Sequence, residues 1–180
     1  HFKFGYSYFS QKKLEEALEQ LNFVKRQSNA YSPASNYYAG YIEYSTGKFD
    51  EALFDLKKAE TSPVYANVVP YLIANVYYKQ GRYDTSLEYA NTLKDRTDIS
   101  NANEIAMLVG EAQYFKGDFK KALDPYQKYL DNTAKAESGL LFRAGYANYA
   151  AGNHAKGIEY LDKAAAAKDR AVQDVLFQKQ

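Results

Sequence analysis

Cysteine and tryptophan are absent from this chain of 180 residues, and methionine occurs once. Without cysteine, a disulfide framework, a thiolate metal site and a cysteine nucleophile are all excluded. An excess of one charge is also lacking, because 23 Lys and Arg residues balance 22 Asp and Glu residues to a net charge of +1. A chain with no basic excess cannot neutralise a phosphate backbone, so nucleic acid is not expected as its partner.

Long apolar runs are missing too, since none approaches the roughly 18 residues that a membrane span needs. We therefore expect no membrane insertion. What the chain does have is tyrosine, with 19 Tyr and 10 Phe residues bringing the aromatic share to 16%. The hydrophobic share of 46% and charged share of 25% are those of an ordinary globular protein.

One sequence pattern recurs along the whole chain and is centred on a turn residue. Successive turn residues lie 35, 34, 36 and 35 positions apart. A repeat of this period predicts an array of similar structural units rather than one irregular core. The turn residues are Lys12 in the opening copy and then Gly47, Gly81, Gly117 and Gly152.

Small residues flank each turn at fixed distances, and two helices approach closely only where side chains are small. Apolar residues follow the helical period throughout and never alternate as in a strand, which predicts two helices per unit. Seven positions before the turn stand Gly5, Gly40, Ala74, Gly110 and Gly145. Five positions after it stand Ala17, Ala52, Ser86, Ala122 and Gly157. The buried stripe continues twelve positions after the turn with Val24, Ala59, Leu93, Tyr129 and Ala164.

This order of small residue, aromatic, turn glycine, aromatic and alanine resembles the tetratricopeptide repeat, and residues 76–84 lie very close to that family's consensus. The resemblance implies an all-α fold, a right-handed superhelical solenoid of antiparallel helix pairs in which first helices line a concave groove. It also implies a scaffold that binds another protein or peptide and is not an enzyme. The chain departs from the family where a tryptophan would stand near the start of each first helix, with Asn36, Pro70, Ala106 and Leu141 there instead.

The resemblance covers the chain, which is expected to be a single solenoid domain over residues 1–180. The expected units are approximately 1–30, 31–65, 66–101, 102–136 and 137–168, followed by a partial sixth helix at 169–180. Neither end carries a polar cap of the kind a solenoid needs, so we expect a fragment of a larger protein. Its Tyr-rich, Cys-free repeats resemble those of bacterial members of the family, some of them associated with the envelope. The compartment is left open between the bacterial cytoplasm and the periplasm or envelope.

No motif in the sequence predicts catalysis. The two histidines, His1 and His154, do not have the spacing of a metal site. Adjacent carboxylates such as Glu15 and Glu16 open second helices, where they favour the helix dipole. No catalytic, cofactor-binding or metal-binding residue is predicted, and no cofactor.

Aromatic side chains are concentrated on one face of the expected first helices. Positions ten, six and three before each turn share a helical face, and twelve of their fifteen residues are aromatic, where the chain average of 16% would give about 2.4. In one interpretation these rings pack between neighbouring first helices and belong to the core. For the column three before the turn, this interpretation has at least as much support as exposure in the groove. In the other, the columns ten and six before the turn project into the groove and bind a partner.

We predict that the second interpretation holds for those two columns. Glu111 supports it, because burying an unpaired carboxylate is costly and its column, six before the turn, should then be open to solvent. The predicted partner-binding groove consists of Phe2, Tyr6, Tyr37, Tyr41, Tyr71, Asn75, Met107, Glu111, Phe142 and Tyr146.

The main functional hypothesis is a protein–protein interaction scaffold that holds a partner peptide or helix in this aromatic groove. One alternative is a structural spacer or a self-association module that stacks through exposed solenoid ends. Another is a regulatory domain attached to a larger protein.

Overall fold

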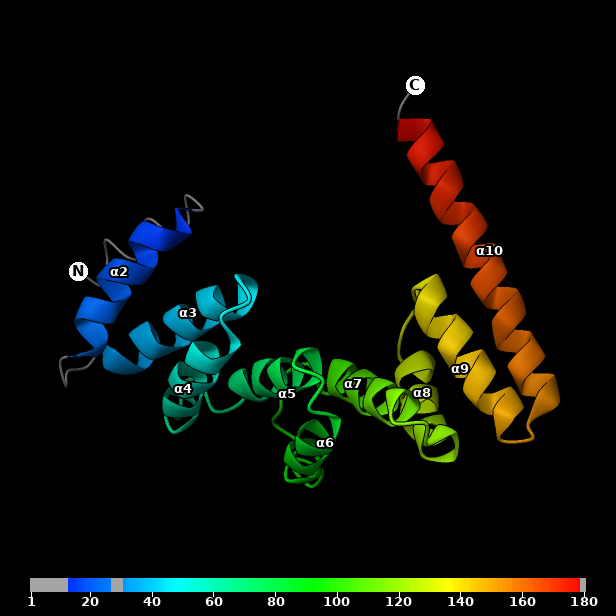
Figure 1. Cartoon of the computed structure of the whole chain (residues 1–180), viewed down its shortest axis with the longest axis horizontal. Helices are drawn as coiled ribbons and strands as arrows, with labels where there is room; N and C mark the ends of the chain where they lie inside the picture. The colour runs from blue at the N-terminus through cyan, green and yellow to red at the C-terminus, as the bar shows by residue number, and fades with distance from the viewer. Residues whose placement is uncertain (1–12, 27–30, 179–180) are drawn as a thin grey trace. The chain divides into compact units, whose positions relative to one another are not determined.

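The computed structural model describes residues 13–26 and 31–178, and within these ranges the chain forms nine α-helices and no strand (Figure 1). The all-α prediction is therefore confirmed. The helices are α2 (Leu14–Lys25), α3 (Ser32–Ser45), α4 (Phe49–Glu60), α5 (Val69–Lys79), α6 (Tyr83–Asn91), α7 (Ala102–Phe115), α8 (Phe119–Asp131), α9 (Ser138–Ala150) and α10 (His154–Gln178).

The helices gather into two compact units, residues 1–102 and 103–180. In the first unit α3 packs against α4, α5 packs against α6, and α2 packs against α3. In the second unit α9 lies beside α10 and also contacts α8 (Figure 1). The helix predicted to open the first repeat, with the predicted groove residues Phe2 and Tyr6, falls outside the described residues.

Each predicted turn glycine ends one helix and allows the next to begin. Gly47, Gly81, Gly117 and Gly152 have positive φ angles of 79°, 73°, 83° and 94°, a left-handed conformation that suits glycine. At the first of them the amide of Gly47 donates to the carbonyl of Tyr44, and the amide of Lys48 donates to that of Glu43 at 2.8 Å. This pair of bonds is the Schellman motif, and it recurs at the other three turns.

The small residues on both sides of the turn are where paired helices meet, as predicted. A Cβ atom added to Gly40 would lie 2.8 Å from the Leu56 side chain, and one added to Gly110 would lie 2.7 Å from the Tyr126 ring. At Gly145 of α9 and Gly157 of α10 the neighbouring atoms are backbone, and an added Cβ on Gly157 would lie 2.9 Å from the Gly145 carbonyl oxygen. Backbone thus faces backbone directly at this pair.

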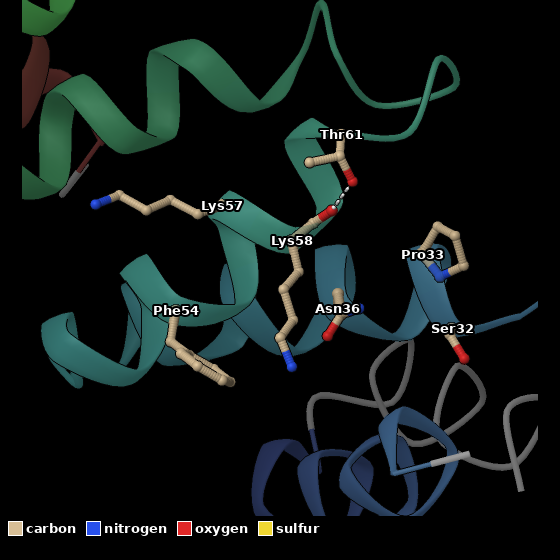
Figure 2. Close-up of a pocket in the computed structure, with 7 residues that line it drawn as sticks. All are labelled: Ser32, Pro33, Asn36, Phe54, Lys57, Lys58 and Thr61. Atoms are coloured by element: carbon tan, nitrogen blue, oxygen red, sulfur yellow. Dashed lines mark hydrogen bonds between the residues drawn. The ribbon is translucent and has the colours of Figure 1, made fainter. Parts of the chain in front are cut away.

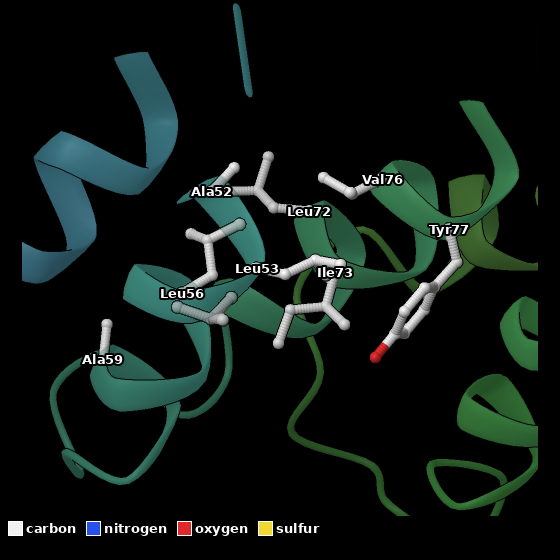
Figure 3. Close-up of a cluster of buried hydrophobic side chains, with 9 residues drawn as sticks. Ala52, Leu53, Leu56, Ala59, Leu72, Ile73, Val76 and Tyr77 are labelled. Carbon is white, nitrogen blue, oxygen red and sulfur yellow. The ribbon is translucent and has the colours of Figure 1, made fainter. Parts of the chain in front are cut away.

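The core runs between successive repeats as well as within them. In the first unit it joins α4 to α5 through a cluster of buried apolar side chains (Figure 3). Leu56 and Ile73 are fully buried at its centre, and Tyr77 closes one side. A second cluster joins α8, α9 and α10 around Tyr126 and Ala144. Each repeat therefore buries its apolar surface partly against its neighbour, as stacked units must.

The end of the chain differs from the prediction of a partial sixth helix over residues 169–180. Helix α10 continues without interruption from His154 to Gln178. The physical reason is local, because no glycine or proline occurs after Gly157 and the run 164–167 consists of alanine, the strongest helix former. Within the described residues, no helix is both long and apolar enough to cross a membrane.

A buried ionic cluster ties α2 to the following repeat. Lys25 Nζ of α2 lies 2.5 Å from Asp55 Oδ2 of α4 and 3.9 Å from Glu43 Oε1 of α3. Both carboxylates are almost fully buried, and one oxygen of each has no hydrogen-bond partner. One ammonium therefore serves two carboxylates, and burial together with the neighbouring Asp55 raises the pKa of Glu43 to about 8.

The approach of α9 to α10 predicts different effects for two glycine substitutions. Gly157→Ala places a methyl group against backbone atoms, so the helices must separate, and overpacking of this kind costs about 1–3 kcal/mol of unfolding free energy. Gly139→Ala, in an exposed position of α9, places its Cβ 3.3 Å from Arg143 Nη1 at the tip of a side chain and meets no backbone atom of another helix, so it should change the unfolding free energy by less than ~1 kcal/mol. Urea denaturation of both variants checks this, and equal stability would show that the contact is not tight.

The cluster around Glu43 predicts a stability that falls as pH rises. The unfolded chain releases the Glu43 proton near its ordinary pKa of 4.5, whereas the folded chain keeps it until about 8. Between those values each pH unit removes up to about 1.4 kcal/mol from the free energy of unfolding, so this contribution is complete below pH 4.5 and lost above 8. Glu43→Gln cannot titrate, and its Tm should fall less than that of the unmodified protein between about pH 5 and 8.5.

The matched control for that comparison is Glu88→Gln, which removes an exposed carboxylate from α6 of the same unit. It should keep the pH dependence of the unmodified protein. A Glu43→Gln profile that follows the unmodified protein at every pH would contradict the assignment of this titration to Glu43.

Candidate functional site

The predicted groove residues of the first unit lie on α3 and α5 and are mostly half-buried. Tyr37 stacks on Tyr65, with ring centroids 4.7 Å apart and an interplanar angle of 15°. Burial raises the pKa of Tyr37, which keeps its hydroxyl protonated. Tyr71 packs at the margin of the core that joins α4 to α5. Tyr41 is the more open of these rings, with 38% of its surface exposed.

Asn75 of α5 has a structural partner on the neighbouring first helix. Its side-chain amide donates to the hydroxyl oxygen of Tyr44 on α3 and, at 3.4 Å, to that of Tyr71. Only 7% of the Asn75 surface is exposed. This residue therefore links two first helices, and it does not present a free amide to solvent.

The first helices of the second unit expose far more aromatic surface. Phe142, Tyr146 and Tyr149 follow one another at i, i+4 and i+7 along α9, so they share one face of the helix. They are 52%, 46% and 49% exposed, and Phe115 at the end of α7 is 47% exposed. We call these four side chains, Phe115, Phe142, Tyr146 and Tyr149, the aromatic patch.

Two partly covered rings hold Tyr146 in place. Its ring lies edge-to-face with Phe119 at 5.3 Å and with Tyr114 at 6.2 Å between centroids. Tyr114 in turn makes an edge contact with Phe115 at 5.3 Å. The opposite face of α9 is buried in the core through Leu140, Leu141 and Ala144. Neighbouring rings thus hold the exposed Tyr146 ring, and the core of the unit is filled by the other face of α9.

Glu111 of α7 is buried, and both of its carboxylate oxygens accept hydrogen bonds. The Arg143 guanidinium of α9 donates to both carboxylate oxygens through Nε and Nη2, each at 2.7 Å, and the hydroxyl of Tyr126 donates at 3.1 Å. Two parallel charge-assisted bonds of this kind are strong and fix orientation. They anchor α7 to α9, while burial and the charge of Glu111 raise the pKa of Tyr126.

The expectation that the column six before the turn is open to solvent is wrong for two of its members. Glu111 is 3% exposed and Asn75 is 7% exposed, so neither lines an open groove. The physical reason is that the carboxylate is not unpaired, since Arg143 lies one repeat further along the chain. Tyr41 and Tyr146 of the same column are exposed, and Met107 packs against the core of its unit.

Sequence reasoning missed Phe115, although the sequence holds a signal for it. Two positions before the turn, the other four repeats carry Ser10, Ser45, Lys79 and Ala150. An aromatic residue in a column that is otherwise polar or small has no shared packing role, and that difference would have identified it. Tyr149, assigned evenly to core or groove, is 49% exposed.

The chemistry of this surface is that of recognition. Among the described residues, no group of three His, Cys, Asp or Glu side chains is placed to hold a metal ion. The exposed groups are rings and hydroxyls, with the Arg143 guanidinium 5.7 Å from the Phe115 ring centroid. Such a surface offers apolar contact area, edges of rings and hydrogen-bonding tips.

Solved structures show the same fold over nearly the whole chain. The MamA RS-1 ArsTM double mutant has a TM-score of 0.79 at 18% identity, covering 94% of this chain and 93% of its own. MamA 41-end from Desulfovibrio magneticus RS-1 has a TM-score of 0.77 at 18% identity, with 93% of each chain covered. YrrB, described as a TPR protein with an unusual peptide-binding site, has a TM-score of 0.72 at 19% identity, covering 99% of this chain and 90% of its own.

No curated protein sequence matches the chain. The sequence pattern of the tetratricopeptide repeat, however, matches residues 2–63 and 71–137, well over half of its length. The turn glycines, the small residues at each helix contact and the solved structures agree with that match. The chain therefore belongs to the tetratricopeptide repeat family, whose members generally serve as protein-binding scaffolds.

Proposed function

We propose that this chain is a protein–protein interaction scaffold that binds a peptide or helix of a partner on the exposed aromatic faces of its first helices. The observation that carries the proposal is the aromatic patch, with Phe115, Phe142, Tyr146 and Tyr149 each about half exposed. These exposed rings lie on one face of the helices and are held by neighbouring rings. A cluster of exposed apolar side chains of this kind is typical of a surface that another molecule covers.

The geometry supports a preformed binding surface. Tyr146 is held by edge contacts to Phe119 and Tyr114, and α9 is fixed to α7 by the pair between Glu111 and Arg143. Rings that are already ordered lose little side-chain entropy when a partner binds, and tyrosine and phenylalanine bring a large contact area for that cost. In the first unit, the exposed Tyr41 ring would contribute, and the half-buried Tyr37 and Tyr71 would contribute less.

A double substitution in the aromatic patch tests the proposal. Phe142→Ser with Tyr146→Ser should weaken binding of a peptide selected against the chain from a display library by at least ~10-fold, because aromatic anchors dominate interface energies. The free energy of unfolding should fall by about 0.5 kcal/mol for Phe142 and by about 1–2 kcal/mol for Tyr146, which loses its edge contacts with Phe119 and Tyr114. Calorimetric titration measures the binding, and urea denaturation measures the stability.

The matched control is Ile158→Ser on the second helix α10, because Ile158 is 52% exposed, as is Phe142. It removes a similar apolar surface from outside the patch and should leave peptide affinity within about twofold. Unchanged affinity in the double variant, or a loss of several kcal/mol in its stability, would show that the patch is not the binding surface.

A further inference from the structure

The first unit contains a hollow between α3 and α4, away from the aromatic faces described above. Its volume is about 520 Å³, and Figure 2 shows the side chains around it. The lining residues of α4, together with the residue that caps its end, follow an i, i+3, i+4, i+7 spacing and so share one face of that helix. The lining consists of Phe54, Lys57 and Lys58 of α4, the C-cap residue Thr61, and Ser32, Pro33 and Asn36 of α3.

Phe54 distinguishes this hollow from the equivalent place in every other repeat. It stands seven positions after its turn residue and is 62% exposed. The same column holds an exposed acidic residue in each of the other four repeats, namely Glu19, Glu88, Asp124 and Glu159. An exposed phenylalanine in place of a solvated carboxylate costs solubility and has no packing function in its own fold, which points to a contact with another molecule.

A positive charge lies beside the Phe54 ring. Lys58 Nζ lies 4.3 Å from the Phe54 ring centroid, whereas the Lys57 side chain extends away from Lys58 (Figure 2) and its Nζ lies 5.6 Å from the Tyr77 ring centroid. Among the described residues that line the hollow there is no carboxylate. The hollow therefore pairs an apolar surface with the Lys58 ammonium group, and its complement is an apolar group beside a negative charge.

Asn36 provides an independent observation in the same hollow. Its side chain is 8% exposed, and its Oδ1 atom is buried without a hydrogen-bond partner. A buried acceptor without a donor is costly, so the site gains when an N–H group reaches it. Figure 2 shows Asn36 between the Lys58 side chain and Pro33. Because its oxygen is covered in the free chain, an entering donor reaches that atom only after the amide group rotates.

We propose that this hollow is a second docking site, which takes an extended segment of a partner protein with an apolar side chain next to an acidic one. The apolar side chain packs on Phe54, the carboxylate pairs with the Lys58 ammonium group, and a backbone N–H donates to Asn36. The site lies on α3 and α4 and does not depend on the aromatic patch of α7 and α9.

The test uses the full chain and a defined probe, a fluorescein-labelled peptide with two Leu-Glu pairs flanked by Gly and Ser. Fluorescence anisotropy should show saturable binding that weakens at least ~10-fold in Phe54→Glu, which restores the acid of the other repeats. The peptide with Lys in place of Glu should not bind. In a ¹⁵N spectrum the Asn36 side-chain amide signals should shift during the titration.

The control variant Tyr146→Ser should keep the affinity of the unmodified protein for this probe within about twofold. Three results of the peptide titration would overturn the proposal: no binding of the acidic peptide, equal binding to Phe54→Glu, or a loss of binding in Tyr146→Ser instead. A concentration-dependent dimer that Phe54→Glu abolishes would assign the hollow to a second copy of the chain and would equally overturn it. Circular dichroism of Phe54→Glu verifies that the exposed substitution leaves the helices intact.

Discussion

The close approach of two helices across a glycine turn is the constraint on which the rest of this protein depends. The Schellman turn at Gly47 and its three counterparts reverses the chain within a few residues. The two helices that the turn joins can then pack closely only where small residues face each other. At Gly145 and Gly157 the two backbones are in direct contact. Once this contact is fixed, helical periodicity decides which face of each first helix is buried and which remains free.

Buried polar residues hold successive repeats together at positions where apolar side chains would be expected. Asn75 links α5 to α3, Glu111 links α7 to α9, and Lys25 joins α2 to the carboxylates of the next repeat. Each of these bridges connects successive repeats rather than the two helices of one repeat. Neighbouring first helices are thereby held in register, so the rings between them form a fixed surface. Truncating one partner of such a buried pair leaves the other uncompensated, which is why these bridges specify the stacking.

The sequence predicted the features that depend on residue spacing and failed where the outcome depends on distant partners. The turn glycines, the small residues at helix contacts and the buried stripe through Val24 and Leu93 were predictable, because local sterics and helical period determine them. The burial of Glu111 was not predictable, because its partner Arg143 lies 32 residues away and no residue spacing in the sequence indicates that the two side chains pair. The exposure of the patch could be predicted only in outline, because a ring three positions before a turn is half-buried at Tyr114 but exposed at Tyr149.

The central claim is that exposed rings of the first helices, rather than the buried tyrosines, meet the partner. The most direct measurement is an NMR titration of the chain, labelled with ¹³C in its Tyr and Phe rings, with the display-selected peptide. We expect the Phe142 and Tyr146 ring signals to shift and saturate with the peptide, while the buried Tyr126 ring stays unchanged. Saturable binding that leaves the Phe142 and Tyr146 signals in place would contradict this claim.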